Sequence, residues 1–353
     1  MLNKTTRRLA QCLAALTLLG WSEIHASDEL VILNWADYLD ETLIEAFEQQ
    51  YNTKIRQVYF ETDQDRDVLL AQYSRAGFDL AMVDAVTIEY YQRSGWLLPL
   101  SVEEVPNLQH INPDFWRHYP AIKGYAAPYA WGTMGIIYRS DLVEQPLTSW
   151  KQLLQPAPEL SGKIIMIGDS FDLTAAANKA LGHPMMTTDR RHLQEAEIFL
   201  RAQRPHVKRY GYVTLGEDSE LISGEVVATQ AYNGDYYAVQ EYQPELVYVI
   251  PEEGGSVWLD SFVLFESSKN QQLAKKFIDF INEPENAAQN AESIYYATPN
   301  KAAKAHLSKA FLEDKVIHPS SEALANCERF QAVPAKVVGW YNTIYHSVIQ
   351  SEE

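Results

Sequence analysis

This chain of 353 residues contains almost no cysteine, since Cys12 and Cys327 are the only two. Cys12 lies in an N-terminal stretch typical of a targeting signal, so the exported chain would keep Cys327 alone. We therefore expect no disulfide within the chain, and the fold must be stabilised by its hydrophobic core. The hydrophobic content of 46% is sufficient for one large domain or two medium ones.

Basic residues are also scarce, with 29 Lys and Arg against 47 Asp and Glu and a net charge of −18. Such a deficit argues against nucleic acid or anionic lipid as a partner, because both repel an acidic surface. It is compatible with a cationic ligand, or with solubility alone. Apolar runs long enough to span a bilayer are missing, because residues 9–20 are too few.

Residues 1–26 are predicted to be a cleavable signal peptide. Lys4, Arg7 and Arg8 precede the apolar stretch, and Ala26 offers a small residue for cleavage near Ser27. An uncleaved anchor is the alternative. Removal of these residues would make the net charge −20. We expect an exported, soluble protein of the periplasm.

Motifs for catalysis and metal binding are missing as well. The nine histidines show no metal-binding spacing, and neither a phosphate loop nor a Gly-x-Ser-x-Gly motif is present. Asp169-Ser170 after a predicted strand, with Asp189 and His192 downstream, resembles pieces of a serine-esterase signature. Asp189 and His192, however, belong to one predicted helix. We expect no enzyme, no cofactor and no metal, and keep a serine esterase as a remote alternative.

Strands and helices alternate along most of the chain. Residues 30–33, 55–60 and 79–83 are predicted strands separated by helices, which is the rhythm of a parallel sheet covered by helices. Residues 125–132 interrupt this rhythm, and the extended stretch 134–138 leads into a second lobe of strands and helices. The chain after the loop 295–300 is predicted to be helical, with Gln331 near the last turns.

The segment 251–261 lies at the centre of this interpretation. Its glycines, Gly254 and Gly255, allow a sharp turn with a close backbone approach. Trp258 and Asp260 are two residues apart, so an extended segment places both side chains on the same side. A flat apolar face beside an anion suits an organic cation with an alkyl body. The alternative is a core tryptophan beside a turn-capping aspartate.

Polar and aromatic residues follow the predicted strands at their ends. Because ligands of open α/β sheets bind outside the carboxyl ends of strands, we expect these residues to meet one ligand between two lobes. The set is Trp35, Asp37, Tyr38, Asp84, Asp169, Asp172, Tyr232 and Asp260. Structural alternatives exist for the acids: Asp84 and Asp169 as helix caps, Asp172 as a first-turn acid and Asp37 as a solvated loop residue.

Five short motifs occur in order along the chain: Asn34-Trp35-x-Asp37-Tyr38, Pro128-Tyr129-x-Trp131-Gly132, Ser149-Trp150, Gly254-Gly255-x-x-Trp258-x-Asp260-Ser261 and Thr298-Pro299-Asn300. In them the sequence resembles the periplasmic spermidine/putrescine-binding proteins of bacterial polyamine uptake. The resemblance implies the α/β, two-lobed periplasmic binding protein fold of type II, each lobe a mixed sheet flanked by helices, with hinge crossovers. Lobe 1 would comprise residues 27–133 with 260–310, and lobe 2 residues 134–259 with 311–353.

The resemblance also implies roles for the candidate residues. Aromatic walls around a methylene chain would be formed by Trp35, Tyr38, Tyr232, Trp258 and Tyr296. Ammonium groups would be held by Asp169, Asp172 and Asp260, with Asp37 at the mouth of the cleft and Gln331 hydrogen-bonding at one end. The chain departs from the family at four positions. Asp172 stands where glutamate is usual and Tyr232 where tryptophan is usual. Val86 stands in place of an aromatic residue, and Asp84 in place of a small polar one. Residues 61–66 also depart from the usual pattern, so the preferred polyamine stays open.

We expect a monomer that closes on spermidine, norspermidine or putrescine and delivers it to an inner-membrane ABC permease. The alternative is a polyamine sensor that regulates a membrane cyclic-di-GMP receptor and biofilm formation.

Overall fold

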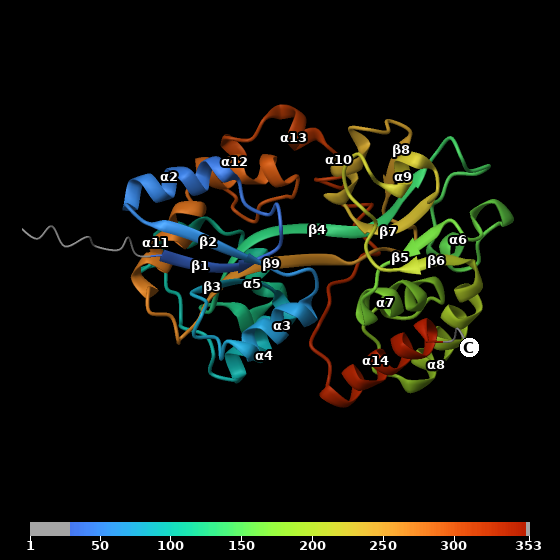
Figure 1. Ribbon diagram of the computed structural model, residues 1–353, viewed down its shortest axis with the longest axis horizontal. Coiled ribbons are helices and arrows are strands. Elements are labelled where there is room, and N and C mark those ends of the chain that lie inside the picture. Colours follow the sequence, from blue (N-terminus) through green and yellow to red (C-terminus); the bar gives the residue numbers. More distant parts are fainter. Residues whose placement is uncertain (1–28, 351–353) are drawn as a thin grey trace, which may run out of the picture.

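The computed structural model describes residues 29–350, so the predicted signal peptide lies outside the described residues. Two lobes lie side by side and share one sheet of nine strands (Figure 1). The strand order is β2-β1-β3-β9-β4-β7-β5-β6, and β8 pairs with β4. Within residues 29–350, none of the helices is both long and apolar enough to cross a membrane.

The first lobe is built on three parallel strands and one antiparallel strand. The strands are β1 (Glu29–Asn34), β2 (Lys54–Tyr59), β3 (Leu80–Asp84) and the antiparallel β9 (Val257–Leu264). The helices are α2 (Glu41–Tyr51), α3 (Asp63–Gln72), α4 (Ala85–Arg93), α5 (Pro113–His118), α11 (Gln271–Ile281) and α12 (Pro284–Ile294). A short helix, α13 (Lys309–Glu313), begins the segment that returns to the second lobe. Short 3-10 turns are η1 (Pro106–His110), η2 (Pro120–Ile122) and η5 (Ala303–Ala305).

The second lobe repeats the pattern of a mixed sheet covered by helices. Its strands are β5 (Ile164–Met166), β6 (Val207–Tyr210), β7 (Ala228–Tyr232) and β8 (Leu246–Val249). Its helices are α6 (Trp150–Leu154), α7 (Ser170–Ala180), α8 (Arg190–Gln203), α9 (Glu220–Ser223), α10 (Asp235–Gln240) and α14 (Ala335–Ile349). The 3-10 turns η3 (Pro158–Leu160) and η4 (Arg204–His206) complete it.

The lobes are connected by β4 (Ala126–Arg139), by β9 and by the chain between α13 and α14 (Figure 1). β4 changes partners midway: residues up to Thr133 pair with β9, and residues from Met134 on pair with β7. The predicted close approach at the glycines is confirmed. A Cβ on Gly254, whose φ is +93°, would lie 1.9 Å from the Asn326 carbonyl oxygen, and one on Gly255 would lie 1.9 Å from that of Met134.

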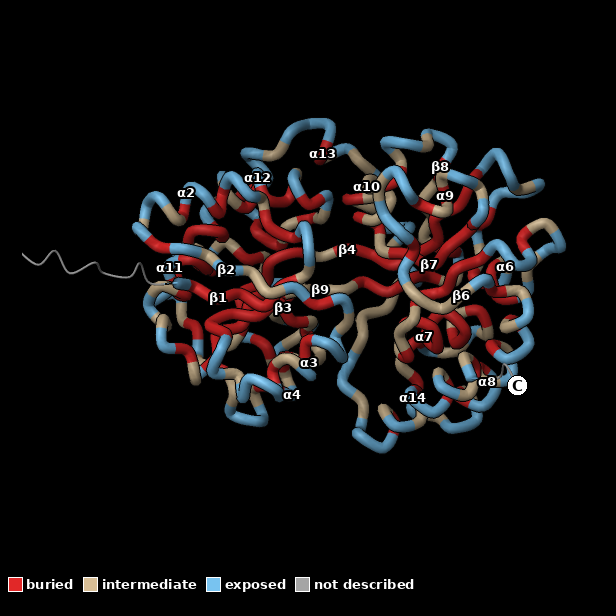
Figure 2. Tube along the Cα trace, viewed as in Figure 1, coloured by how far each residue is buried: buried red, intermediate tan, exposed pale blue. Residues whose placement is uncertain are grey.

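Each lobe has its own hydrophobic core, and the crossing strands β4 and β9 are buried as well (Figure 2). In lobe 1, apolar side chains pack on both faces of β1 and β3, with Phe47 and Phe277 on one face and Leu70 and Phe265 on the other. In lobe 2 the core surrounds Trp150, whose indole N–H donates to the Gly254 carbonyl at 2.9 Å. This bond fastens the turn before β9 to the lobe-2 core.

Two expectations about secondary structure are wrong. Asp260 is not at a strand end but in the middle of β9, because the strand begins at Val257 rather than after the acid. Gln331 is not in the last turns of a helix: it lies in irregular chain before α14. Pro319 and Pro334 explain the second difference, because proline removes a backbone donor and disfavours helix before it.

Candidate binding site

The predicted pairing of Trp258 and Asp260 on one side of an extended segment is present in β9. Both residues are partly exposed, and they alternate with the buried Val257, Leu259 and Ser261. The alternative of a turn-capping aspartate does not apply, since Asp260 pairs within the sheet. Its register partner on β3 is Asp84, so the two acids face the same side of the sheet.

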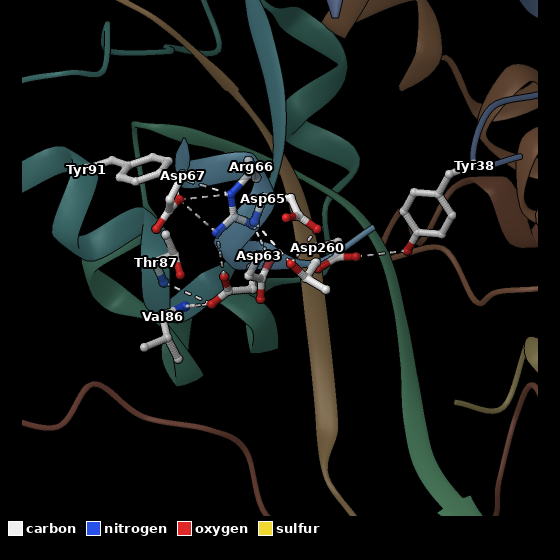
Figure 3. Close-up of polar contacts among 11 residues, drawn as sticks. Tyr38, Asp63, Asp65, Arg66, Asp67, Val86, Thr87, Tyr91 and Asp260 are labelled. Atoms are coloured by element: carbon white, nitrogen blue, oxygen red, sulfur yellow. Dashed lines mark hydrogen bonds and ion pairs between the residues drawn. The ribbon is translucent and has the colours of Figure 1, made fainter. Parts of the chain in front are cut away.

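Asp260 is held by a tyrosine from the loop after β1. The Tyr38 hydroxyl donates to Asp260 Oδ2 at 3.1 Å (Figure 3), and the Tyr38 carbonyl accepts from the hydroxyl of Tyr129 on β4. Burial raises the pKa of Asp260 to about 7, Asp63 and Asp84 add to the rise, and the bond from Tyr38 opposes it. A carboxylate in this state gains from a neighbouring cation.

On lobe 2, two predicted acids lie at the start of α7. Asp169 caps this helix, because its Oδ1 accepts the backbone N–H groups of Phe171 and Asp172. Asp172 is in the first turn, 6% exposed, and its Oδ2 accepts the Tyr232 hydroxyl at 2.7 Å. Burial and the charge of Asp169 raise the pKa of Asp172, while the Tyr232 bond opposes that rise. Asp169 therefore caps α7 and Asp172 lies in its first turn, and these positions leave the prediction of ligand contact open.

Aromatic rings connect the acids of the two lobes. Tyr232 and Trp258 meet edge to face at 6.1 Å between ring centroids, Trp258 and Tyr296 at 4.9 Å, and Tyr296 and Tyr38 at 5.7 Å. The structure thus brings four of the five predicted wall residues into one row. The indole N–H of Trp258 is buried without a hydrogen-bond partner among the described residues. A row of rings with an acid at either end can enclose an alkyl chain with charged ends.

Asp84 caps α4, and its position links the site to a buried arginine. Its Oδ1 accepts the N–H groups of Val86 and Thr87, whereas Oδ2 has no hydrogen bond and lies 3.8 Å from the guanidinium of Arg66. Arg66 is 1% exposed and also pairs with Asp63, both on α3 (Figure 3). Sequence reasoning missed Asp63 and Arg66, and noted only that residues 61–66 depart from the family pattern.

Asp235 is a second acid that sequence reasoning missed. It begins α10, and its Oδ2 accepts the backbone N–H of Tyr232 at 3.0 Å. Burial raises the pKa of Asp235 to about 7, while Tyr232 and the Tyr296 hydroxyl oppose the rise. Gly234 precedes it because a Cβ there would lie 2.1 Å from the Tyr296 ring. Asp235 therefore helps to position two tyrosines, Tyr232 of lobe 2 and Tyr296 of lobe 1.

The remaining predicted residues are less closely joined to this group. The Trp35 ring lies against that of Phe60, tilted by 54° with 4.3 Å between the ring centroids, and packs against both apolar clusters of lobe 1. Asp37 is exposed, with a φ of +52° in the turn between Trp35 and Tyr38. Gln331 is exposed in the chain that returns to lobe 2. Within the described part of the chain, neither Asp37 nor Gln331 forms a hydrogen bond or an ion pair with Asp260, Asp172 or the rings between them.

The chemistry of this group is that of binding. Within residues 29–350, His, Cys, Asp and Glu form no cluster suited to a metal ion. The Ser170 hydroxyl donates to Asn342 at 2.8 Å rather than to a histidine, and Asp189 caps the helix that holds His192. The arrangement of an esterase triad is therefore not formed by these residues.

Comparison with known proteins agrees with this description. Residues 42–319 match the bacterial extracellular solute-binding proteins. The chain belongs to this family. Membership confirms the prediction of a binding protein that is not an enzyme, and the two-lobed α/β fold is the one predicted.

Individual relatives cover most of the chain. It is 29% identical to the spermidine/putrescine-binding periplasmic protein of Escherichia coli (strain K12) over 314 residues, which are 88% of this chain and 89% of the relative. It is 29% identical to the norspermidine sensor of Vibrio cholerae over 299 residues, 84% of this chain and 82% of the relative. A solved spermidine/putrescine ABC transporter substrate-binding protein of Streptococcus pneumoniae superposes with a TM-score of 0.77 at 27% identity, covering 91% of this chain and 98% of the other.

Proposed function

We propose that this chain is an exported polyamine-binding protein that closes its lobes around spermidine, norspermidine or putrescine. The observation that carries the proposal is a pair of carboxylate–tyrosine contacts on opposite lobes, Asp260 with Tyr38 and Asp172 with Tyr232. Trp258 and Tyr296 lie between them. An ammonium group that leaves water needs charge-assisted acceptors, and methylene groups gain from apolar ring faces.

Closure would follow from contacts that exist only when both lobes meet the ligand, which shifts the population towards the closed state. We assign residues 27–133 with 260–310 to one lobe and 134–259 with 311–353 to the other. The partner change of β4 between Thr133 and Met134 supports this limit. Asp169 and Asp84 would add charge, Trp35 a further ring, Asp37 an acid at the mouth and Gln331 a hydrogen bond at one end.

We further propose that the closed monomer delivers the amine to an ABC permease in the inner membrane. Support comes from relatives named as polyamine-binding proteins of the periplasm and of an ABC transporter. The second candidate, signalling to a membrane receptor, is favoured by similarity to the norspermidine sensor of Vibrio cholerae. Neighbouring permease and ATPase genes would support uptake, and a lone cyclic-di-GMP enzyme would support sensing.

A thermal-shift titration of the purified protein tests the proposed ligand class. Spermidine, norspermidine and putrescine are compared with neutral amino acids and sugars, using the Asp172→Asn/Asp260→Asn double variant as the control for the site. A ligand at 100 times its Kd should stabilise the protein by about 2.7 kcal/mol. A shift caused only by sugars or amino acids, or an equal shift in the double variant, contradicts the proposal.

A further inference from the structure

Arg66 is a buried cation surrounded by more carboxylates than it can neutralise. Its guanidinium pairs with Asp63, lies 3.4 Å from Asp67 and lies 3.8 Å from Asp84. Its Nε donates to the Tyr91 hydroxyl at 3.2 Å, and that hydroxyl donates to Asp67 (Figure 3). One positive charge thus faces three acids, so the group as a whole is anionic when the acids are ionised.

This group adjoins the proposed polyamine site through the sheet. Asp84 and Asp260 are direct cross-strand partners on β3 and β9, where two like charges repel each other. Asp260 has Tyr38 as its neutral donor, and Asp84 has Arg66. The acids therefore form a continuous row from Asp260 through Asp84 to Asp63.

Asp63 is the most exposed acid of this row. It also interacts electrostatically with acids of the other lobe. Its side chain is 50% exposed although its guanidinium partner is buried. Its charge interacts with that of Asp169, which caps α7 of lobe 2, and with that of Asp172 in the first turn of this helix. Although half of its side-chain surface is exposed, the surrounding protein removes part of the hydration of Asp63 and raises its pKa to about 7; Arg66 opposes the rise, and Asp84, Asp169 and Asp67 add to it. Without a further cation, Asp63 would face uncompensated acids on both sides.

We propose that Asp63 is a ligand-contacting carboxylate held in place by Arg66, and that it makes the site select triamines over diamines. The inference rests on the proposed polyamine function. The acids form three groups: Asp260 beside Tyr38, Asp169 with Asp172 beside Tyr232, and Asp63 with Asp84 beside Arg66. A diamine has cations for two of these groups, whereas a triamine has one for each. Arg66 is a positioning residue because its guanidinium is buried behind the carboxylates.

Isothermal titration calorimetry with spermidine and putrescine tests this proposal on the Asp63→Asn variant. Asn has nearly the same shape but no charge, and the exposed position should tolerate it. We expect the affinity for spermidine to fall about tenfold or more, because the variant leaves one ammonium group unpaired. The affinity for putrescine should fall by less than about threefold, since two acid groups remain.

Asp65→Asn is the matched control, because Asp65 is on the same helix and is exposed, and its carboxylate accepts a hydrogen bond from the Thr62 hydroxyl at the cap rather than from Arg66. It removes the same charge from the same helix but from a different face, so it should change neither affinity by more than about twofold. Arg66→Lys should reproduce part of the spermidine loss, because lysine keeps the charge without the fork that holds two carboxylates.

The outcomes separate this inference from the proposed function. If the unaltered protein binds neither spermidine nor putrescine, the proposed function itself is wrong. If it binds them but Asp63→Asn behaves like Asp65→Asn, only the role of Asp63 is overturned. Equal losses for spermidine and putrescine in Asp63→Asn would also overturn it, because selectivity would then be unchanged.

Discussion

The two walls of the candidate site hold their acids in different ways. On lobe 1, Asp63 and Asp84 share the buried cation Arg66, and Asp260 lies beside them. On lobe 2, the main groups that stabilise Asp169 and Asp172 are neutral: backbone N–H groups and the Tyr232 hydroxyl. The acids of the lobe-1 wall are therefore partly neutralised by a cation of the protein itself. The acids of the lobe-2 wall repel each other, and a bound cation would relieve this repulsion.

The largest effect is expected from removing the internal cation. Arg66→Met should destabilise the ligand-free protein by about 3 kcal/mol, at the low end for a broken buried ion pair because Asp63 and Asp67 are half exposed. Urea unfolding monitored by circular dichroism measures this. The control is Arg191→Met, whose side chain is 81% exposed and pairs with Asp189, and which should leave the free energy of unfolding nearly unchanged. Equal losses would show that lobe 1 does not depend on Arg66.

The next effect concerns affinity on the lobe-1 wall. Asp260→Asn should reduce the free energy of spermidine binding by about 2–4 kcal/mol, because it leaves an ammonium group without its partner in a partly buried place. Asp37→Asn should cost roughly 0–1 kcal/mol, because Asp37 is exposed. Calorimetric titration of both variants decides the ranking, and similar losses would remove Asp260 from its central role.

Removing a charge from the lobe-2 wall should stabilise the ligand-free protein, whereas removing Arg66 from lobe 1 should destabilise it. Asp172→Asn removes a charge that has no ion-pair partner within residues 29–350, while the amide oxygen can still accept the Tyr232 hydroxyl. We therefore expect the ligand-free protein to gain about 1–2 kcal/mol at pH 8, and spermidine to bind more weakly. Thermal melting with and without spermidine measures both, with the exposed Asp218→Asn as control. A loss of stability in the ligand-free variant would contradict the comparison.

The smallest effect is the pH dependence of the unbound protein. The pKa values of Asp63 and Asp260 are each raised to about 7 in the folded state, against about 4 when unfolded. The folded protein therefore binds more protons between these values, and its stability falls as pH rises from about 4 to about 7. Because solvent screens both groups, we expect a loss on the order of 1 kcal/mol.

Binding of a polyamine should reverse this dependence. The cation favours the ionised acids, so spermidine should release protons and stabilise the protein more at pH 8 than at pH 5. Melting curves at the two pH values, with and without spermidine, give the difference. A larger stabilisation at pH 5 would mean that these acids do not face the ligand.

Local sequence patterns predicted the helix-covered sheets and part of the site, whereas the two-lobed binding-protein fold was implied by the family resemblance. Alternating strands and helices predicted the covered sheets, and the two-residue spacing of Trp258 and Asp260 predicted their common side of β9. The glycines before β9 predicted a close approach, which Gly254 makes to Asn326. Each of these features is determined by residues that are close together in the sequence, so a single sequence is enough to predict it.

The missed features depend on partners far apart in the chain. Arg66 reaches Asp84 and Tyr91 only after α3 and α4 have packed together, and nothing in the local sequence marks it as buried. Asp84 and Asp169 each cap a helix through Oδ1, which explains why a cap and a site acid look identical in sequence. The helix expected around Gln331 failed because two prolines lie in that segment.

A crystal structure of the protein grown with spermidine tests the central claim most directly. We predict one amine between the lobes, with ammonium nitrogens within hydrogen-bonding distance of Asp260 and of Asp172 and the methylene chain against Trp258. An amine bound elsewhere, or lobes that close on a neutral molecule, would contradict it.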